Sequence, residues 1–219
     1  MTGAGRDLGI EPDLANRRPL KSRETGWASA ATRLLLATRI TANQVSVLGV
    51  LISLAGAWAF VAAPRLPWLY LAGALAIQLR LLCNMLDGLV AVEGGRKSAY
   101  GPLYNELPDR IEDSVFLAAF GHAAGLFWLG LTAALLAAVT AYVRALGGTF
   151  GFAQDFRGPM AKPHRMAALT LGGVAACAEA LWWGTSWSLL VTLALVTAGT
   201  ALTIVRRVLG IARQLKAAA

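Results

Sequence analysis

Hydrophobic positions in this chain gather into long runs and do not alternate with polar ones. A helix needs about 20 mostly apolar residues to cross the hydrocarbon core of a bilayer, and these runs have that length. The pattern therefore predicts about six membrane-spanning helices. They cover residues 43–63, 68–92, 101–123, 127–149, 165–183 and 187–208.

A segment of mixed character precedes the first run. Across residues 20–40, leucines and Trp27 alternate with arginines and Lys21 at spacings that suit a helix lying in the membrane interface. Where this segment ends, we expect Thr41 or Asn43 to cap the first span.

Composition supports the membrane assignment. The 219 residues are 57% hydrophobic and only 15% charged, whereas about 25% of a soluble domain is charged. We predict an all-α integral membrane protein in two parts. A cytoplasmic N-terminal segment with the interfacial helix occupies residues 1–42, and a six-helix membrane domain occupies residues 43–219.

Lysine and arginine collect on one side of the predicted membrane. The N-terminal segment, Arg96 and Lys97, residues 150–165 and the C-terminal tail are basic, whereas the connections between them carry only Arg65. Basic short loops stay in the cytoplasm, so we predict a multi-pass protein of the cell's inner (cytoplasmic) membrane. The net charge of +8 suits a face against anionic lipid and calls for no nucleic acid partner.

Six of the twelve acidic residues fall within residues 84–113, at the end of the second predicted span, in the link and at the start of the third span. Asn84 and Asp87 are three residues apart, and Asn105 and Asp109 are four apart, so each pair shares a helix face. Ionisable groups at membrane depth usually face the bundle interior. We therefore expect these four side chains to point at one another near the cytoplasmic face.

Clustered carboxylates need a positive charge among them. Oxygen donors without His or Cys favour Mg²⁺, Mn²⁺ or Ca²⁺ over zinc, and an open site of this kind commonly meets phosphate. Gly88 and Gly101 flank the acids and leave room for a ligand. Arg80 and Arg110 are expected as ion-pair partners of the acids. The two asparagines alone are equally explained as hydrogen bonds between helices.

These residues resemble the signature of the CDP-alcohol phosphotransferases (CDP-alcohol phosphatidyltransferases). That signature reads D-x-x-D-G-x-x-A-R, eight residues, then G-x-x-x-D-x-x-x-D. This chain has Asn84-x-x-Asp87-Gly88-x-x-Ala91 and, after the same gap, Gly101-x-x-x-Asn105-x-x-x-Asp109. It departs at both asparagines and at Val92, which replaces the arginine. Some bacterial members carry the same asparagines. The loss of two charges leaves the number of metal ions open.

The resemblance covers most of the chain. Thr41-Ala42-Asn43 resembles the T-P-N segment that opens the family's first span, and six helices after an interfacial helix match the family fold. Members are commonly homodimeric, so a homodimer is one candidate assembly.

The resemblance also implies a mechanism. In the family, metal ions bridge the pyrophosphate of a CDP-alcohol, an acceptor hydroxyl attacks, and CMP leaves. Carried over, Asn84, Asp87, Asn105 and Asp109 would hold Mg²⁺ or Mn²⁺, and Asp109 would also be the base. The expected donor is CDP-diacylglycerol, and the product is a phospholipid of the surrounding membrane.

A basic loop leads into the fifth run, and family members carry a basic patch there for an anionic acceptor. The acceptor would be a polar alcohol, and a phosphorylated alcohol is one candidate. The basic residues of this loop are equally explained as the ordinary positive charge of a cytoplasmic loop. The expected substrate-binding residues are Asn43, Gly88, Ala91, Gly101, Arg144, Arg157, Lys162 and Arg165.

Two other functions stay open. Asn84 and Asn105 also suit a catalytically silent relative that binds CDP-alcohols without turnover. The pair Asp87 and Asp109 also suits a small ion-coupled transporter, although such proteins usually bind near the midplane, between repeated halves. Glycerol phosphate, inositol phosphate and serine all remain candidate acceptors.

Overall fold

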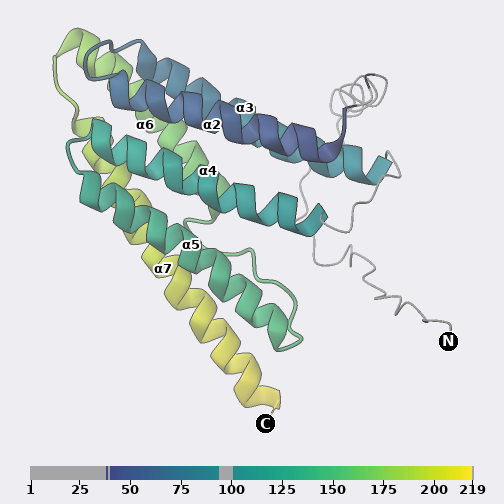
Figure 1. Ribbon diagram of the computed structural model, residues 1–219. Helices are drawn as coiled ribbons and strands as arrows, with labels where there is room; N and C mark the ends of the chain where they lie inside the picture. Colours follow the sequence, from purple (N-terminus) through teal and green to yellow (C-terminus); the bar gives the residue numbers. More distant parts are fainter. Residues whose placement is uncertain (1–37, 39, 94–100, 219) are drawn as a thin grey trace.

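The computed structural model describes residues 38, 40–93 and 101–218, and the helices of this part are labelled α2 to α7 (Figure 1). The predicted all-α fold is confirmed. The predicted boundaries lie close to those observed, except that α7 continues well past residue 208. The helices are α2 (Ala42–Ala62), α3 (Leu69–Glu93), α4 (Gly101–Ala123), α5 (Phe127–Thr149), α6 (Lys162–Trp182) and α7 (Trp187–Ala218).

Four described helices, α2, α3, α5 and α7, are long and apolar enough to cross a membrane. This architecture is that of a multi-pass membrane protein. Six spans are predicted, and four of the described helices meet this criterion of length and hydropathy. The other two helices, α4 and α6, have charged first halves, which reduces their mean hydropathy. The predicted interfacial helix falls almost wholly outside the described residues.

Thr41 caps the first described helix, as the sequence predicts. Its hydroxyl accepts a hydrogen bond from the main-chain nitrogen of Gln44 at 3.3 Å, and the Gln44 side chain accepts one from the nitrogen of Thr41 at 2.9 Å. This reciprocal pair satisfies two main-chain donors that a helix start otherwise leaves free.

The helices pack as an antiparallel bundle in which α2 contacts α3 and α4, and α5 contacts α4 and α7 (Figure 1). Helix α6 joins α3 to α7. The core contains the rings of Phe60, Phe116 and Phe120, which meet edge to face. Because α3 and α4 both contact α2, Asp87, Glu112 and Asp113 are buried in the bundle.

Glycines allow α4 and α5 to approach closely where they turn into each other. A Cβ on Gly130 would lie 2.6 Å from the carbonyl oxygen of Leu117 and 2.9 Å from the Cα of Gly121. Both of these neighbours are main-chain atoms of a packed helix, so neither can move aside cheaply.

We expect Gly130→Ala to lower the free energy of unfolding by about 1–3 kcal/mol, because the added methyl group separates the two helices. Gly148→Ala is a matched control in α5, since a Cβ there meets only Gln154 at 3.9 Å. Thermal unfolding in detergent would compare them. Equal melting temperatures for the two variants would contradict the close-packing explanation.

Candidate active site

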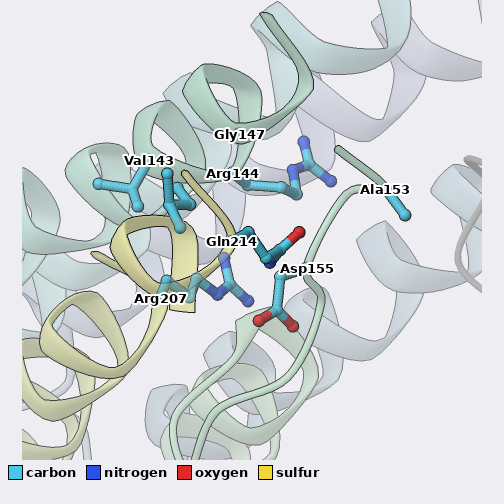
Figure 2. A pocket seen from close by; sticks show the side chains of 8 residues that line it. Val143, Arg144, Gly147, Ala153, Asp155, Arg207 and Gln214 are labelled. Atoms are coloured by element: carbon cyan, nitrogen blue, oxygen red, sulfur yellow. The ribbon is translucent and has the colours of Figure 1, made fainter. Parts of the chain in front are cut away.

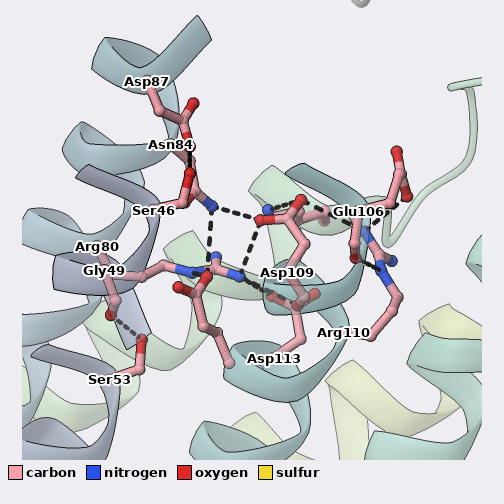
Figure 3. Close-up of polar contacts among 12 residues, drawn as sticks. Ser46, Gly49, Ser53, Arg80, Asn84, Asp87, Glu106, Asp109, Arg110 and Asp113 are labelled. Carbon is pink, nitrogen blue, oxygen red and sulfur yellow. Dashed lines mark hydrogen bonds and ion pairs between the residues drawn. The ribbon is translucent and has the colours of Figure 1, made fainter. Parts of the chain in front are cut away.

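Helices α3 and α4 bring the central residues of the signature together (Figure 3). Arg80, Asn84 and Asp87 follow one another at helical spacing along one face of α3. Nδ2 of Asn84 donates a hydrogen bond to Oδ1 of Asp109 at 2.5 Å and lies 3.5 Å from Oε2 of Glu112. The polar faces of the two helices therefore meet inside the bundle.

Asp87 is held from a third helix. Its side chain is buried, and its Oδ2 accepts a hydrogen bond from the hydroxyl of Ser46 in α2 at 2.7 Å. No sequence motif marks Ser46. The sequence offers one signal, since a serine in an apolar span needs a polar partner at membrane depth.

Arg80 is the central cation of the cluster, and its predicted pairing with the acids is confirmed. Its guanidinium lies 2.5 Å from Glu112, 2.6 Å from Asp113 and 3.5 Å from Asp109. Arg110 likewise lies 3.4 Å from Asp109. Burying an arginine is costly unless carboxylates compensate it, and three do so here.

The start of α6 supplies two more cations. The ammonium of Lys162 contacts Oδ2 of Asp109 directly. Arg165 is only 1% exposed, and it donates to Asp113 at 3.1 Å and to the carbonyl oxygen of Met160 at 3.0 Å. Lys162 therefore contacts Asp109, the expected base, whereas Arg165 is buried in an ion pair with Asp113.

Arg144 reaches the rim of the cluster from α5. It donates to both carboxylate oxygens of Glu106, at 2.6 and 2.7 Å, and lies 5.1 Å from the ring centre of Phe156. Its Nε is buried and has no hydrogen-bond partner within the described part of the chain.

A small hollow opens beside Arg144, between α5, α7 and the loop before α6 (Figure 2). Arg207 is nearly buried there and donates to the carbonyl oxygens of Thr140 and Arg157. In the sequence, the signal for Arg207 is its position within the predicted span 187–208, where a charge needs a partner. The lining residues are Val143, Arg144, Gly147, Ala153, Asp155, Arg207, Ile211 and Gln214.

The loop residue Arg157 is exposed and pairs with Asp155 at 3.0 Å. Partial burial of Asp155 opposes its ionisation, but hydrogen bonds from Arg157 and the charges of Arg157 and Arg207 hold its pKa below the usual range. The hollow therefore combines two arginines with one ionised carboxylate.

The remaining predicted residues are placed less fully. Asn43 is partly exposed in the first turn of α2, and Gly88 follows Asp87 in α3. The side chains at positions 91, 101 and 105 lie outside the described part, so the structure places Asn105 only as a residue of α4.

The described donors suit a cation that is shared with a substrate. Among residues 38, 40–93 and 101–218, no three His, Cys, Asp or Glu side chains lie close enough to hold a metal ion together. Mg²⁺ is usually held by one or two carboxylates together with substrate phosphates. Asp87 and Asp109 supply two carboxylates, one from α3 and one from α4.

The chain is similar in sequence to one curated protein and in fold to solved structures. No protein-family model matches the chain. Archaetidylinositol phosphate synthase of Aeropyrum pernix is 37% identical over 113 residues, which span 49% of this chain and 58% of that protein. The chain thus matches little more than half the length of this curated relative.

Solved structures of Mycobacterium tuberculosis phosphatidylinositol phosphate synthase share the fold. The complex with manganese and citrate has a TM-score of 0.70 at 24% identity, covering 83% of this chain and 87% of that one. The complex with CDP-DAG has a TM-score of 0.67 at 24% identity, covering 84% and 92%.

Proposed function

We propose that this protein is a CDP-alcohol phosphotransferase that transfers a phosphatidyl group from CDP-diacylglycerol to a polar alcohol and releases CMP. The observation that carries the proposal is the hydrogen bond from Asn84 of α3 to Asp109 of α4, with Asp87 held beside it on the same face of α3 by Ser46, at the spacing of the family signature. The fold shared with a synthase solved with CDP-DAG supports the same reaction.

For the acceptor, we propose a phosphorylated polyol, with inositol phosphate as the first candidate. Both named relatives are synthases of inositol phosphate lipids. Arg144 and Arg207 beside the hollow suit an anionic group, because guanidinium groups bind phosphate through paired hydrogen bonds.

Asp87 and Asp109 would hold Mg²⁺ or Mn²⁺, and Asn105 would add an amide oxygen from α4. Asn84 would offer its oxygen only after turning its amide over, since its nitrogen faces Asp109. When bound, the cation would neutralise the pyrophosphate and orient it for in-line attack. The site residues otherwise contribute position and charge, which dominate phosphoryl transfer.

The reaction needs one base. The carboxylate of Asp109 takes the proton of the acceptor hydroxyl, whose oxygen forms a bond to the phosphorus that carries diacylglycerol. The bond from that phosphorus to the CMP oxygen breaks, and CMP leaves with the electron pair. Lys162, already in contact with Asp109, lies where it can neutralise phosphate charge.

We further propose that the site faces the cytoplasm from the inner membrane and that two copies form a homodimer. The lysines and arginines of the loops and the tail support this orientation. CDP-diacylglycerol would enter from the membrane, and the polar acceptor from the water.

The proposal is tested with purified protein, CDP-diacylglycerol, Mg²⁺ and one acceptor at a time. We expect one CMP for each phosphatidylinositol phosphate detected by mass spectrometry, and none in EDTA. CDP-diacylglycerol binding without CMP release would indicate a silent relative. Ion flux in proteoliposomes without CMP release would indicate a transporter.

A further inference from the structure

A ring of hydrogen bonds joins two residues of α3 to two of α4 at the centre of the polar cluster (Figure 3). Arg80 donates from Nε to Glu112 at 2.5 Å and from Nη2 to the main-chain oxygen of Asp109 at 3.3 Å. Asn84 donates to Asp109 at 2.5 Å and lies 3.5 Å from Glu112. Asp109 and Glu112 are therefore each contacted by both Arg80 and Asn84.

The two acids determine which way the amide of Asn84 turns. An atom that lies between the oxygens of two ionised carboxylates must carry hydrogens, because carboxylates only accept. Nδ2 of Asn84 is that atom. A methyl group on Gly49 of α2 would lie 3.7 Å from Oδ1 of Asn84 and 3.0 Å from Oε1 of Glu112. These two oxygens therefore lie on the side of the ring that faces α2.

The two oxygens of Asp109 have different surroundings. Oδ1 lies against Asn84 and Arg80, whose side chain is fully buried. Oδ2 lies against Lys162 and Arg110, whose side chains are 19% and 24% exposed. Arg80 is fixed by packing, and the partly buried Asn84 is held by its hydrogen bonds to Asp109 and Glu112. Partly exposed lysine and arginine side chains exchange partners readily. Oδ1 of Asp109 is thus anchored, whereas the two cations that contact Oδ2 can exchange it for another partner.

We propose that Arg80 and Asn84 are positioning residues that hold Oδ1 of Asp109, so that Oδ2 is the oxygen that receives the acceptor proton. Asn84 then acts as a hydrogen-bond donor and not as a ligand of the cation. This inference rests on the proposed function, in which Asp109 is the base.

The ring also gives a reason for an amide at position 84. A carboxylate there would face Asp109 and Glu112 without a donor between them. It would add a third negative charge to the ring, whose one cation, Arg80, is already shared among Asp109, Glu112 and Asp113, while Lys162 and Arg110 contact the other oxygen of Asp109. Like charges at this separation destabilise each other strongly unless a cation lies among them.

The decisive variant is Asn84→Ala, compared with wild type in two measurements. Without metal, in EDTA, we expect the melting temperature to fall by ~4 °C or more, because the partly buried Asp109 and the buried Glu112 lose a donor. With saturating Mg²⁺, we expect kcat to fall tenfold to about a hundredfold, as for other small misplacements of a reacting group. The half-saturating Mg²⁺ and the KM for CDP-diacylglycerol should stay within about twofold.

Gln78→Ala is the matched control, because it removes an interhelical hydrogen bond from the same helix. Gln78 donates to Thr170 of α6 at 2.8 Å, away from the acids. Its kcat should equal that of wild type. Arg80→Lys keeps the charge but cannot reach three partners with one rigid fork, so it should lower kcat in the same way as Asn84→Ala.

A rise of tenfold or more in half-saturating Mg²⁺ for Asn84→Ala, with kcat and the metal-free melting temperature unchanged, would make Asn84 a ligand and overturn the inference. Equal losses of kcat in Gln78→Ala would also overturn it, because any weakening of α3 would then have the same effect. A wild type that releases no CMP would instead contradict the proposed function, while the melting temperatures in EDTA would still test the ring.

Discussion

Replacing Asp109 by asparagine should reduce CMP release at least a hundredfold while binding of CDP-diacylglycerol with metal survives. An amide cannot accept the hydroxyl proton, and a positioned general base contributes about 10²- to 10⁴-fold. The amide oxygen can still accept the hydrogen bond of Asn84, so the fold should persist. Single-turnover CMP release and ligand-induced thermal stabilisation would measure the two effects separately.

Glu106→Gln is the control for this change of charge. Glu106 lies one turn before Asp109 on α4, its side chain is 51% exposed, and its amide would still accept from Arg144. We expect its kcat to change little. Activity of Asp109→Asn within about threefold of wild type would remove Asp109 from the role of base.

The helices and the central acids could be predicted because their signals are local. Runs of apolar residues set the lengths of α2, α3 and α5 nearly to the residue, since each run must cross the same thickness of membrane. Helical spacing placed Asn84 and Asp87 on one face without reference to any other helix. The end of α7 was missed because a helix that leaves the membrane no longer needs apolar residues.

The partners of the buried charges could not be predicted, because they depend on how each helix is rotated against its neighbours. Arg165 follows a basic loop and was expected to bind phosphate, yet it pairs with Asp113, which lies 52 positions away. Glu112 likewise lies in the interior, although the sequence alone also suits a solvated side chain at this position. No spacing within α4 or α6 specifies that these faces meet.

Arg165 is buried and paired with Asp113, so acceptor binding is better tested at Arg144. Its guanidinium lines the hollow, and its buried Nε has no partner in the described part of the chain. A charge-assisted hydrogen bond contributes about 1.5–3 kcal/mol, so Arg144→Gln should raise the KM for a phosphorylated acceptor at least tenfold. The KM for CDP-diacylglycerol should change little, because that substrate reaches the site from the membrane. Initial rates of CMP release would measure both constants, with inositol phosphate varied in one series and CDP-diacylglycerol in the other.

Arg213→Gln is the control, because it removes the same charge from the exposed end of α7. If positive charge on the inner face merely concentrates an anionic acceptor, the two variants should raise KM equally, and added salt should abolish both effects. If Arg144 binds the phosphate, only Arg144→Gln should raise KM, and the increase should persist in salt. Arg144→Gln should also leave the KM for an acceptor without phosphate unchanged, since such an acceptor has no anionic group for Arg144 to bind. An unchanged acceptor KM in Arg144→Gln would show that the hollow does not bind the acceptor. Lys162, the described cation nearest to Asp109, would then be the next residue to test.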